Sequence, residues 1–247
     1  MINSVRNTVM SVLNKNNYGY LSPSDFNLFA KQAQLDLFEN YFYQYNYQVM
    51  KENARQSGTG YADVGRGYAE VIEIFTVTNN LTHIAANTFS VPSVVTTGDD
   101  YYLILKVLCY DASAPPRVFK GEAEKVLNTK ITTLLNSMLT APTEVFPAYT
   151  LQGNVITAYP STFDAATEVE CQYVRYPVDP KWTYVSLTAG EPSFDQSQPD
   201  YQDFELPEDD HVDLVNKILQ YAGIEVREGE AYQFAKTEET QDAQEEK

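Results

Sequence analysis

The stretch SPSDFNLFAKQAQLDLFENYFYQYNYQVMKENAR, from Ser22 to Arg55, decides the fold. Ser22 is in position to act as an N-cap, Pro23 suits the first helical position, and Asp25 lies near the positive end of the helix dipole. After Pro23 the stretch contains neither Gly nor Pro. We therefore predict one long helix, which at about 1.5 Å per residue would reach roughly 50 Å.

Two apolar stripes follow this predicted helix at spacings of three and four residues. The first stripe comprises Phe26, Phe29, Ala30, Ala33, Leu37 and Tyr41. The second, offset stripe comprises Leu35, Phe38, Phe42, Tyr45 and Val49. A helix that lies only on its own core needs one stripe, so two indicate either a central helix buried in its own fold or one that also packs on a neighbouring subunit. The second stripe, together with Trp182, forms our candidate subunit interface.

The rest of the chain predicts an α+β fold, because runs of helix and of strand do not alternate regularly. A short helix over Asn3–Leu13 would form a hairpin with the long helix, and a Gly-rich stretch would follow it as a linker. That stretch resembles a phosphate-binding loop only superficially, because no strand precedes it and no Lys-Ser or Lys-Thr pair follows it.

The middle of the chain predicts a mixed, mainly antiparallel β region with one inserted helix. Tyr68–Thr78 fits a strand or a short helix, and Tyr101–Tyr110 fits a buried central strand. Glu122–Leu139 has helical spacing, while Gly153-Asn154 is typical of a two-residue hairpin turn. Thr167–Tyr176 alternates as a strand does.

A last helix opens with acidic residues after Pro207, ends at Gly223 and packs back on the fold. The residues beyond it are acidic and predict a disordered tail. The predicted organisation is a helical hairpin (1–56), a linker (57–67), a β-rich region (68–178), an extended Pro-rich arm (179–206), the C-terminal helix (207–227) and the tail (228–247).

The chain is strongly acidic, with 34 Asp and Glu against 17 Lys and Arg and a formal charge of −17. This balance excludes a surface that coats nucleic acid, although it suits a passage along which DNA slides without binding. No signal peptide and no apolar run long enough to cross a membrane is apparent, so we expect a protein made in a cytoplasm-like compartment. The many aromatic residues, 19 Tyr and 12 Phe, are typical of large cores and interfaces.

We predict no catalytic residue, no cofactor and no metal site. His83 and His211 have no partner at a metal-binding spacing, and Cys109 and Cys171 fit small buried residues in strands. The acidic residues around 208–213 are explained by the dipole of the last helix and lack the spacing of a calcium loop.

Three stretches together resemble a known family. They are Asn16–Asn27 with Ala33-Gln34 and Leu37–Phe42; Leu139–Thr143 with Phe146–Tyr149 and the hairpin after it; and Tyr173–Pro177 with Pro180–Trp182, Asp203–Pro207, Lys217–Leu219 and Gly223-Ile224. In these stretches the chain resembles the ring (neck or collar) structural proteins of crAss-like tailed bacteriophages.

The resemblance implies a virion protein of the neck or tail, in which many copies assemble as a head–tail connector ring between the portal and the tail. It further implies a homo-oligomer that follows the portal's twelve-fold symmetry, contacts the portal or adjacent ring and tail proteins, and helps to form the conduit for DNA and cargo. Neither a cofactor nor catalysis is implied. Two alternatives stay open: another virion tail component, such as a tail hub or fibre anchor, and a carboxylate-based hydrolase.

Overall fold

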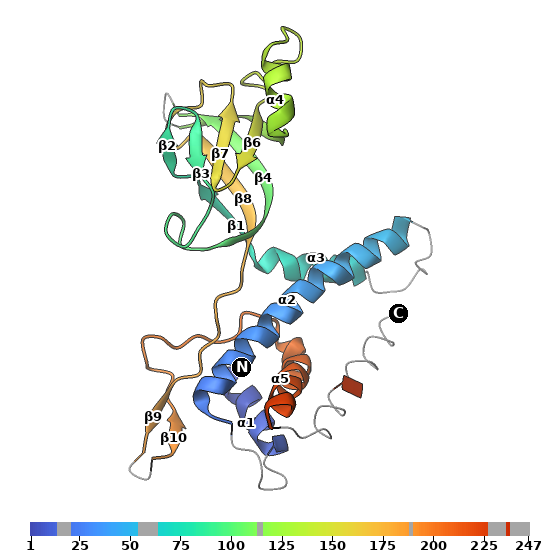
Figure 1. The fold of residues 1–247 in the computed structure, drawn as a ribbon, viewed down its shortest axis with the longest axis vertical. Helices are drawn as coiled ribbons and strands as arrows, with labels where there is room; N and C mark the ends of the chain where they lie inside the picture. The colour runs from blue at the N-terminus through green and yellow to red at the C-terminus, as the bar shows by residue number, and fades with distance from the viewer. Residues whose placement is uncertain (14–20, 54–63, 113–115, 188–189, 227–235, 238–247) are drawn as a thin grey trace. The chain divides into compact units, whose positions relative to one another are not determined.

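The computed structural model describes residues 1–13, 21–53, 64–112, 116–187, 190–226 and 236–237 (Figure 1). Five α-helices and a mostly antiparallel eight-stranded sheet in this part of the chain confirm the α+β class. The chain divides into two compact units. Unit 1 contains Met1–Val71 and Pro177–Lys247, and unit 2 contains Ile72–Tyr176.

Unit 1 is built on helices. They are α1 (Ile2–Leu13), α2 (Pro23–Asn53), the first part of α3 (Val64–Ile74), the short 3-10 helix η2 (Glu208–Asp210) and α5 (His211–Val226). A small hairpin of β9 (Tyr184–Ser186) and β10 (Pro192–Phe194) completes it.

Helix α2 begins where its capping residues predict. The backbone N–H of Asp25 donates to Ser22 Oγ at 3.2 Å, and Ser22 Oγ in turn donates to the Asp25 carboxylate. Phe26 N–H donates to the Ser22 carbonyl at 2.9 Å, which closes the first turn. Ser22 is therefore the N-cap and Pro23 the first helical residue, because both roles are set by local hydrogen bonding.

The C-terminal helix α5 packs against both α1 and α2, as predicted from its apolar stripe (Figure 1). Leu214, Ile218 and Ala222 are completely buried there. Two hydroxyl–carboxylate hydrogen bonds fasten this side of α2: Tyr41 donates to Asp210, and Tyr221 of α5 donates to Asp36. Helix α5 runs through the buried Gly223, so the prediction that it ends at this glycine is wrong.

Unit 2 is built on a single sheet. Its strands are β1 (Thr76–Asn80), β2 (His83–Ala85), β3 (Thr88–Ser90), β4 (Tyr101–Asp111), β5 (Val118–Lys125), β6 (Ala148–Gln152), β7 (Val155–Tyr159) and β8 (Val169–Arg175), with α4 (Asn128–Leu135) between β5 and β6. The strand order is β1-β8-β4-β5-β6-β7-β3-β2, and the β5–β6 pair is parallel. Strand β4 pairs on both sides, with β5 and β8, which confirms its central place.

The sheet curls around one core. Its two edge strands, β1 and β2, are joined by only Leu81 and Thr82, so the two edges meet at that corner. One hydrophobic cluster accordingly collects side chains from strands far apart in the order, such as Phe89 of β3 and Cys171 of β8. The predicted turn at Gly153 joins β6 to β7, and its φ of +57° at the first central position suits a glycine.

Two element predictions are wrong in part. Helix α3 begins at Val64 and so takes in Gly65 and Gly67 of the predicted linker; its Arg66–Glu70 ion pair at 3.0 Å supports it. The rest of the linker, residues 57–63, lies outside the described residues. The predicted helix over Glu122–Leu139 shrinks to α4, because the residues before it form β5 and pair with β4 and β6.

The segment predicted as an extended arm is folded in its described part. It contains the β9–β10 hairpin, whose base is closed by an antiparallel bridge between Lys181 and Gln202. The predicted acidic tail lies outside the described residues except for Lys236 and Thr237.

Candidate subunit interface

The second stripe of α2 does not lie on a separate face of the helix. Phe38 exposes none of its surface and joins the buried first stripe, making an edge-to-face contact with Phe42 at 5.1 Å between ring centroids. Leu35, Phe42 and Val49 are half-buried, and Tyr45 is 36% exposed. The chain's own core therefore uses Phe38, and the rest of the stripe lies along the border of that core.

Part of this border, together with more exposed residues beside it, forms a surface that we call the outer face of α2. It consists of Leu28, Leu35, Phe42, Tyr43, Val49 and Met50. Leu28, Leu35, Phe42 and Val49 recur every seven residues, and Tyr43 and Met50 share that spacing on the adjacent row. Leu28, Tyr43 and Met50 expose more than three fifths of their surface. Compared with the predicted stripe, the candidate interface on α2 therefore loses Phe38 and Tyr45 and gains Leu28, Tyr43 and Met50.

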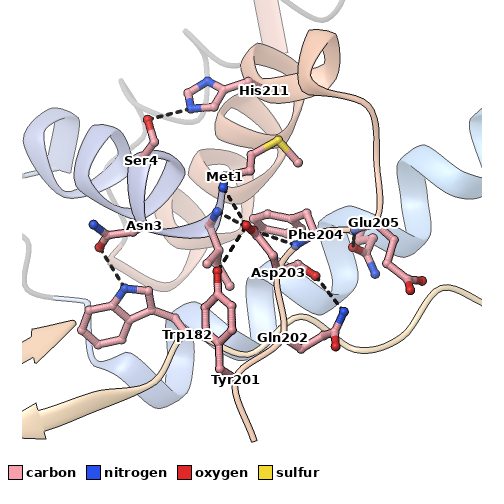
Figure 2. Close-up of polar contacts among 12 residues, drawn as sticks. Met1, Asn3, Ser4, Trp182, Tyr201, Gln202, Asp203, Phe204, Glu205 and His211 are labelled. Carbon is pink, nitrogen blue, oxygen red and sulfur yellow. Dashed lines mark hydrogen bonds and ion pairs between the residues drawn. The ribbon is translucent and has the colours of Figure 1, made fainter. Parts of the chain in front are cut away.

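Trp182 is a core residue of unit 1 and offers no surface to a neighbour. It is 2% exposed, and its ring stacks with those of Tyr184 and Phe194 in the hairpin. The Arg6 guanidinium lies 3.9 Å from the ring centroid. Trp182 Nε1 donates to Asn3 Oδ1 at 3.1 Å, so the indole ties the hairpin to α1 (Figure 2). The prediction that Trp182 belongs to the subunit interface is therefore wrong, because its side chain is buried within unit 1.

Asp203 is a second anchor between α1 and the returning chain (Figure 2). Its carboxylate accepts from the Met1 ammonium and from the Ile2 backbone N–H, each at 2.7 Å, and from the Phe204 N–H at 2.9 Å. Partial burial alone would raise the pKa of Asp203, but these hydrogen bonds outweigh it and lower the pKa. Ion pairing and burial together therefore fix the start of α1.

Sequence reasoning missed a second apolar surface, on the connection between β5 and β6. We call it the α4 tip; it consists of Leu127, Leu135, Met138, Leu139, Val145 and Phe146. Met138 is fully exposed, Leu139 is 96% exposed and Phe146 is 78% exposed. The signal was in the sequence as the apolar spacing of Glu122–Leu139, but that spacing indicates a buried helix as readily as an exposed one.

Of the titratable side chains singled out in the sequence, the cysteines, the histidines and Asp210 are either buried or within hydrogen-bonding distance of another group of the chain. Burial raises the pKa of Cys109, beside Glu168, and that of Cys171 to about 12 in each case, so both thiols are protonated and unreactive at neutral pH. His83 Nε2 is 2.6 Å from the Ala86 carbonyl, and His211 Nε2 is 3.2 Å from Ser4 Oγ. Burial raises the pKa of Asp210, whose carboxylate accepts from Tyr41.

Neither a metal centre nor a bilayer-spanning helix is found among the described residues. No cluster of three or more His, Cys, Asp or Glu side chains in that part of the chain is placed to hold a metal ion. None of the helices seen there combines the length and the apolar character that a membrane span requires. Comparison with protein-family models and with curated protein sequences gives no match to this chain.

Proposed function

We propose that this chain is a structural subunit of a head–tail connector ring in a tailed bacteriophage. The observation that carries the proposal is that each of the two compact units has its own buried core and still exposes a large apolar surface. Unit 1 exposes the outer face of α2, and unit 2 exposes the α4 tip. Apolar surfaces of this kind, left over after a core is complete, are typical of binding surfaces.

Two different surfaces on one chain suit a ring. In a heterologous interface one surface of a subunit contacts a different surface of the next, and repetition by rotation closes a ring. A symmetric dimer would need only one self-complementary surface. The sequence resemblance to phage ring proteins supports the same proposal, and from it we take the twelve-fold symmetry and the position between portal and tail.

The charge of the chain fits a conduit. At −17 the subunit repels the DNA backbone, so a ring of many copies would let DNA pass without holding it. In this proposal neither a cofactor nor catalysis takes part, and the acidic residues serve solubility, helix capping and the passage.

The experiment that tests the proposal is native mass spectrometry with negative-stain imaging. The purified chain is measured alone and after mixing with the portal protein encoded in the same genome. We expect rings of the chain alone or rings that form on the portal, and their mass gives the number of subunits.

A chain that stays monomeric in both mixtures would contradict the connector proposal. A further mixture with the tail proteins of the same genome tests the alternative: binding to one of them without ring formation would favour a tail hub or fibre anchor. The third possibility, a carboxylate-based hydrolase, has no additional support from the described side chains.

A further inference from the structure

The connection 126–147, which carries the α4 tip, joins two parallel strands. Glu124 N–H donates to the Pro147 carbonyl at 2.9 Å and Val126 N–H to the Tyr149 carbonyl at 2.8 Å, so β6 runs beside β5 in the same direction. A parallel pair requires a crossover connection, and a crossover helix ordinarily packs its apolar side on the sheet. In this chain α4 and the turns after it extend beyond the end of the sheet of unit 2 (Figure 1).

Helix α4 buries little of its apolar surface. Within α4, all of whose residues the structure describes, Ile131 is the buried one. Leu127 and Leu135 are exposed, and the turns that follow expose Met138, Leu139 and Phe146. The apolar residues that a crossover would normally place against its own sheet are therefore turned toward solvent.

The helix is also weakly stabilised by its own residues. Its N-cap position is Leu127, which makes no side-chain capping hydrogen bond, and three of its eight residues are threonines. A helix of this length is marginal without tertiary packing. Two contacts tether the connection near its ends: Asn128 Nδ2 donates to the Leu151 carbonyl at 3.2 Å, and Glu144 pairs with Lys120 at 3.2 Å.

The connection differs in charge from the rest of the chain. It contains one lysine, Lys130, and one glutamate, Glu144, so its formal charge is zero in a protein of charge −17. The negative charge of the whole chain would repel nucleic acid and anionic membrane surfaces. The connection also offers them no cluster of basic residues, since Lys130 is its only basic side chain. A second copy of this chain carries the same −17, so copies meet with least repulsion where charge is absent.

We infer that the α4 tip is a docking element that inserts into a second copy of this chain. The inference rests on the proposed function, since it names the surface through which neighbouring subunits would join. On docking, Leu139 and Met138 leave water and α4 gains the packing that its own unit does not provide. The tip then acts as one half of a heterologous contact.

Photo-cross-linking of the full-length protein tests the inference. Leu139→Cys is labelled with benzophenone-maleimide; Cys109 and Cys171 are buried and unreactive, so the label goes to position 139. Labelled protein grown in ¹⁴N is mixed with unlabelled ¹⁵N protein, irradiated and digested for mass spectrometry. We expect cross-linked peptides of mixed isotope composition, which arise only between two copies.

Leu139→Glu supplies the second measurement. We expect it to raise the concentration at which half of the chain is assembled at least about tenfold, because it puts a charge where docking would bury a leucine. Val95→Glu is the matched control: Val95 is also exposed in unit 2, at 94%, but lies far along the chain from the tip. The control should assemble as the wild type does, and circular dichroism should show all three proteins equally folded.

The outcomes separate the inference from the proposed function. If the wild type forms rings, but Leu139→Glu assembles equally well and cross-links stay within one chain, the inference is wrong and the ring proposal stands. When the portal protein is added to the same mixture, cross-links only to the portal would overturn the inference in the same way. A wild-type chain that never assembles, alone or with the portal, contradicts both.

Discussion

At the scale of the residue, burial separates core positions from interface positions on the same predicted stripe. Phe38→Ala should lower the free energy of unfolding by about 3 to 5 kcal/mol, because it empties a completely buried aromatic site. Tyr45→Ala removes a side chain that is 36% exposed and should cost much less. Urea denaturation followed by circular dichroism measures both; equal losses would mean that Tyr45 belongs to the core as well.

Asp203 gives the start of α1 a defined pH dependence. Its pKa is lower in the folded protein than in the unfolded chain, so its contribution to stability is present above the unfolded value of about 3.9. That contribution is lost as the pH falls through the lower, folded pKa. Between about pH 5 and pH 2, wild type should therefore lose more stability than Asp203→Asn, as followed by thermal unfolding at fixed ionic strength. Parallel pH profiles would contradict this role.

At the scale of the element, the absence of a side chain at Gly121 lets the α4 connection lie close against β5. A Cβ built on this residue would come within 2.7 Å of the Val145 carbonyl oxygen, a backbone atom that cannot rotate away. Gly121→Ala should therefore displace the turn around Val145 and destabilise unit 2 by about 1 to 3 kcal/mol. Hydrogen exchange should show faster exchange in residues 141–147, and unchanged exchange there would show that the turn does not depend on Gly121. Gly98→Ala is not a suitable control, because its φ is +92° and the substitution would add backbone strain.

Two tyrosines fasten the helices of unit 1. Tyr41→Phe and Tyr221→Phe each remove the hydroxyl that donates to a carboxylate, of Asp210 and of Asp36 respectively. Each should cost about 1 to 2 kcal/mol, with Tyr41→Phe the more costly because Tyr41 is buried and Tyr221 only half-buried. Chemical denaturation of the single and double variants measures the loss. A Tyr41→Phe protein as stable as wild type would show that the hydroxyl contributes nothing to packing on α2.

Elements set by neighbours in sequence were predictable, and those set by distant partners were not. The cap at Ser22 and the hairpin turn at Gly153 depend on local backbone geometry, so the residue types at these positions predict both features. The predicted helix over Glu122–Leu139 was wrong in its first part because pairing with β4 and β6 overrides helical spacing. Phe38 and Trp182 were wrongly assigned to the interface, because their burial depends on tertiary packing that residue spacing does not show. For Trp182 that packing comes from α1 and the β9–β10 hairpin, which are far away in the sequence.

At the scale of the whole molecule, two units with complete cores and exposed apolar surfaces fit a protein that functions as an assembly. In the proposed ring, the outer face of α2 and the α4 tip would be the two halves of a repeated contact, and the acidic charge would keep free copies apart until these surfaces meet. Raising the ionic strength screens that repulsion, so assembly should strengthen with salt. Sedimentation at about 0.05 M and about 0.5 M salt tests this, and weaker assembly at high salt would mean that ion pairs join the subunits.

Native mass spectrometry of the purified chain, alone and with the portal protein of the same genome, tests the central claim most directly. The account predicts a closed oligomer of uniform mass, formed alone or on the portal, that Leu139→Glu weakens and Val95→Glu does not. A wild-type chain that remains a monomer, both alone and with the portal protein, would contradict it.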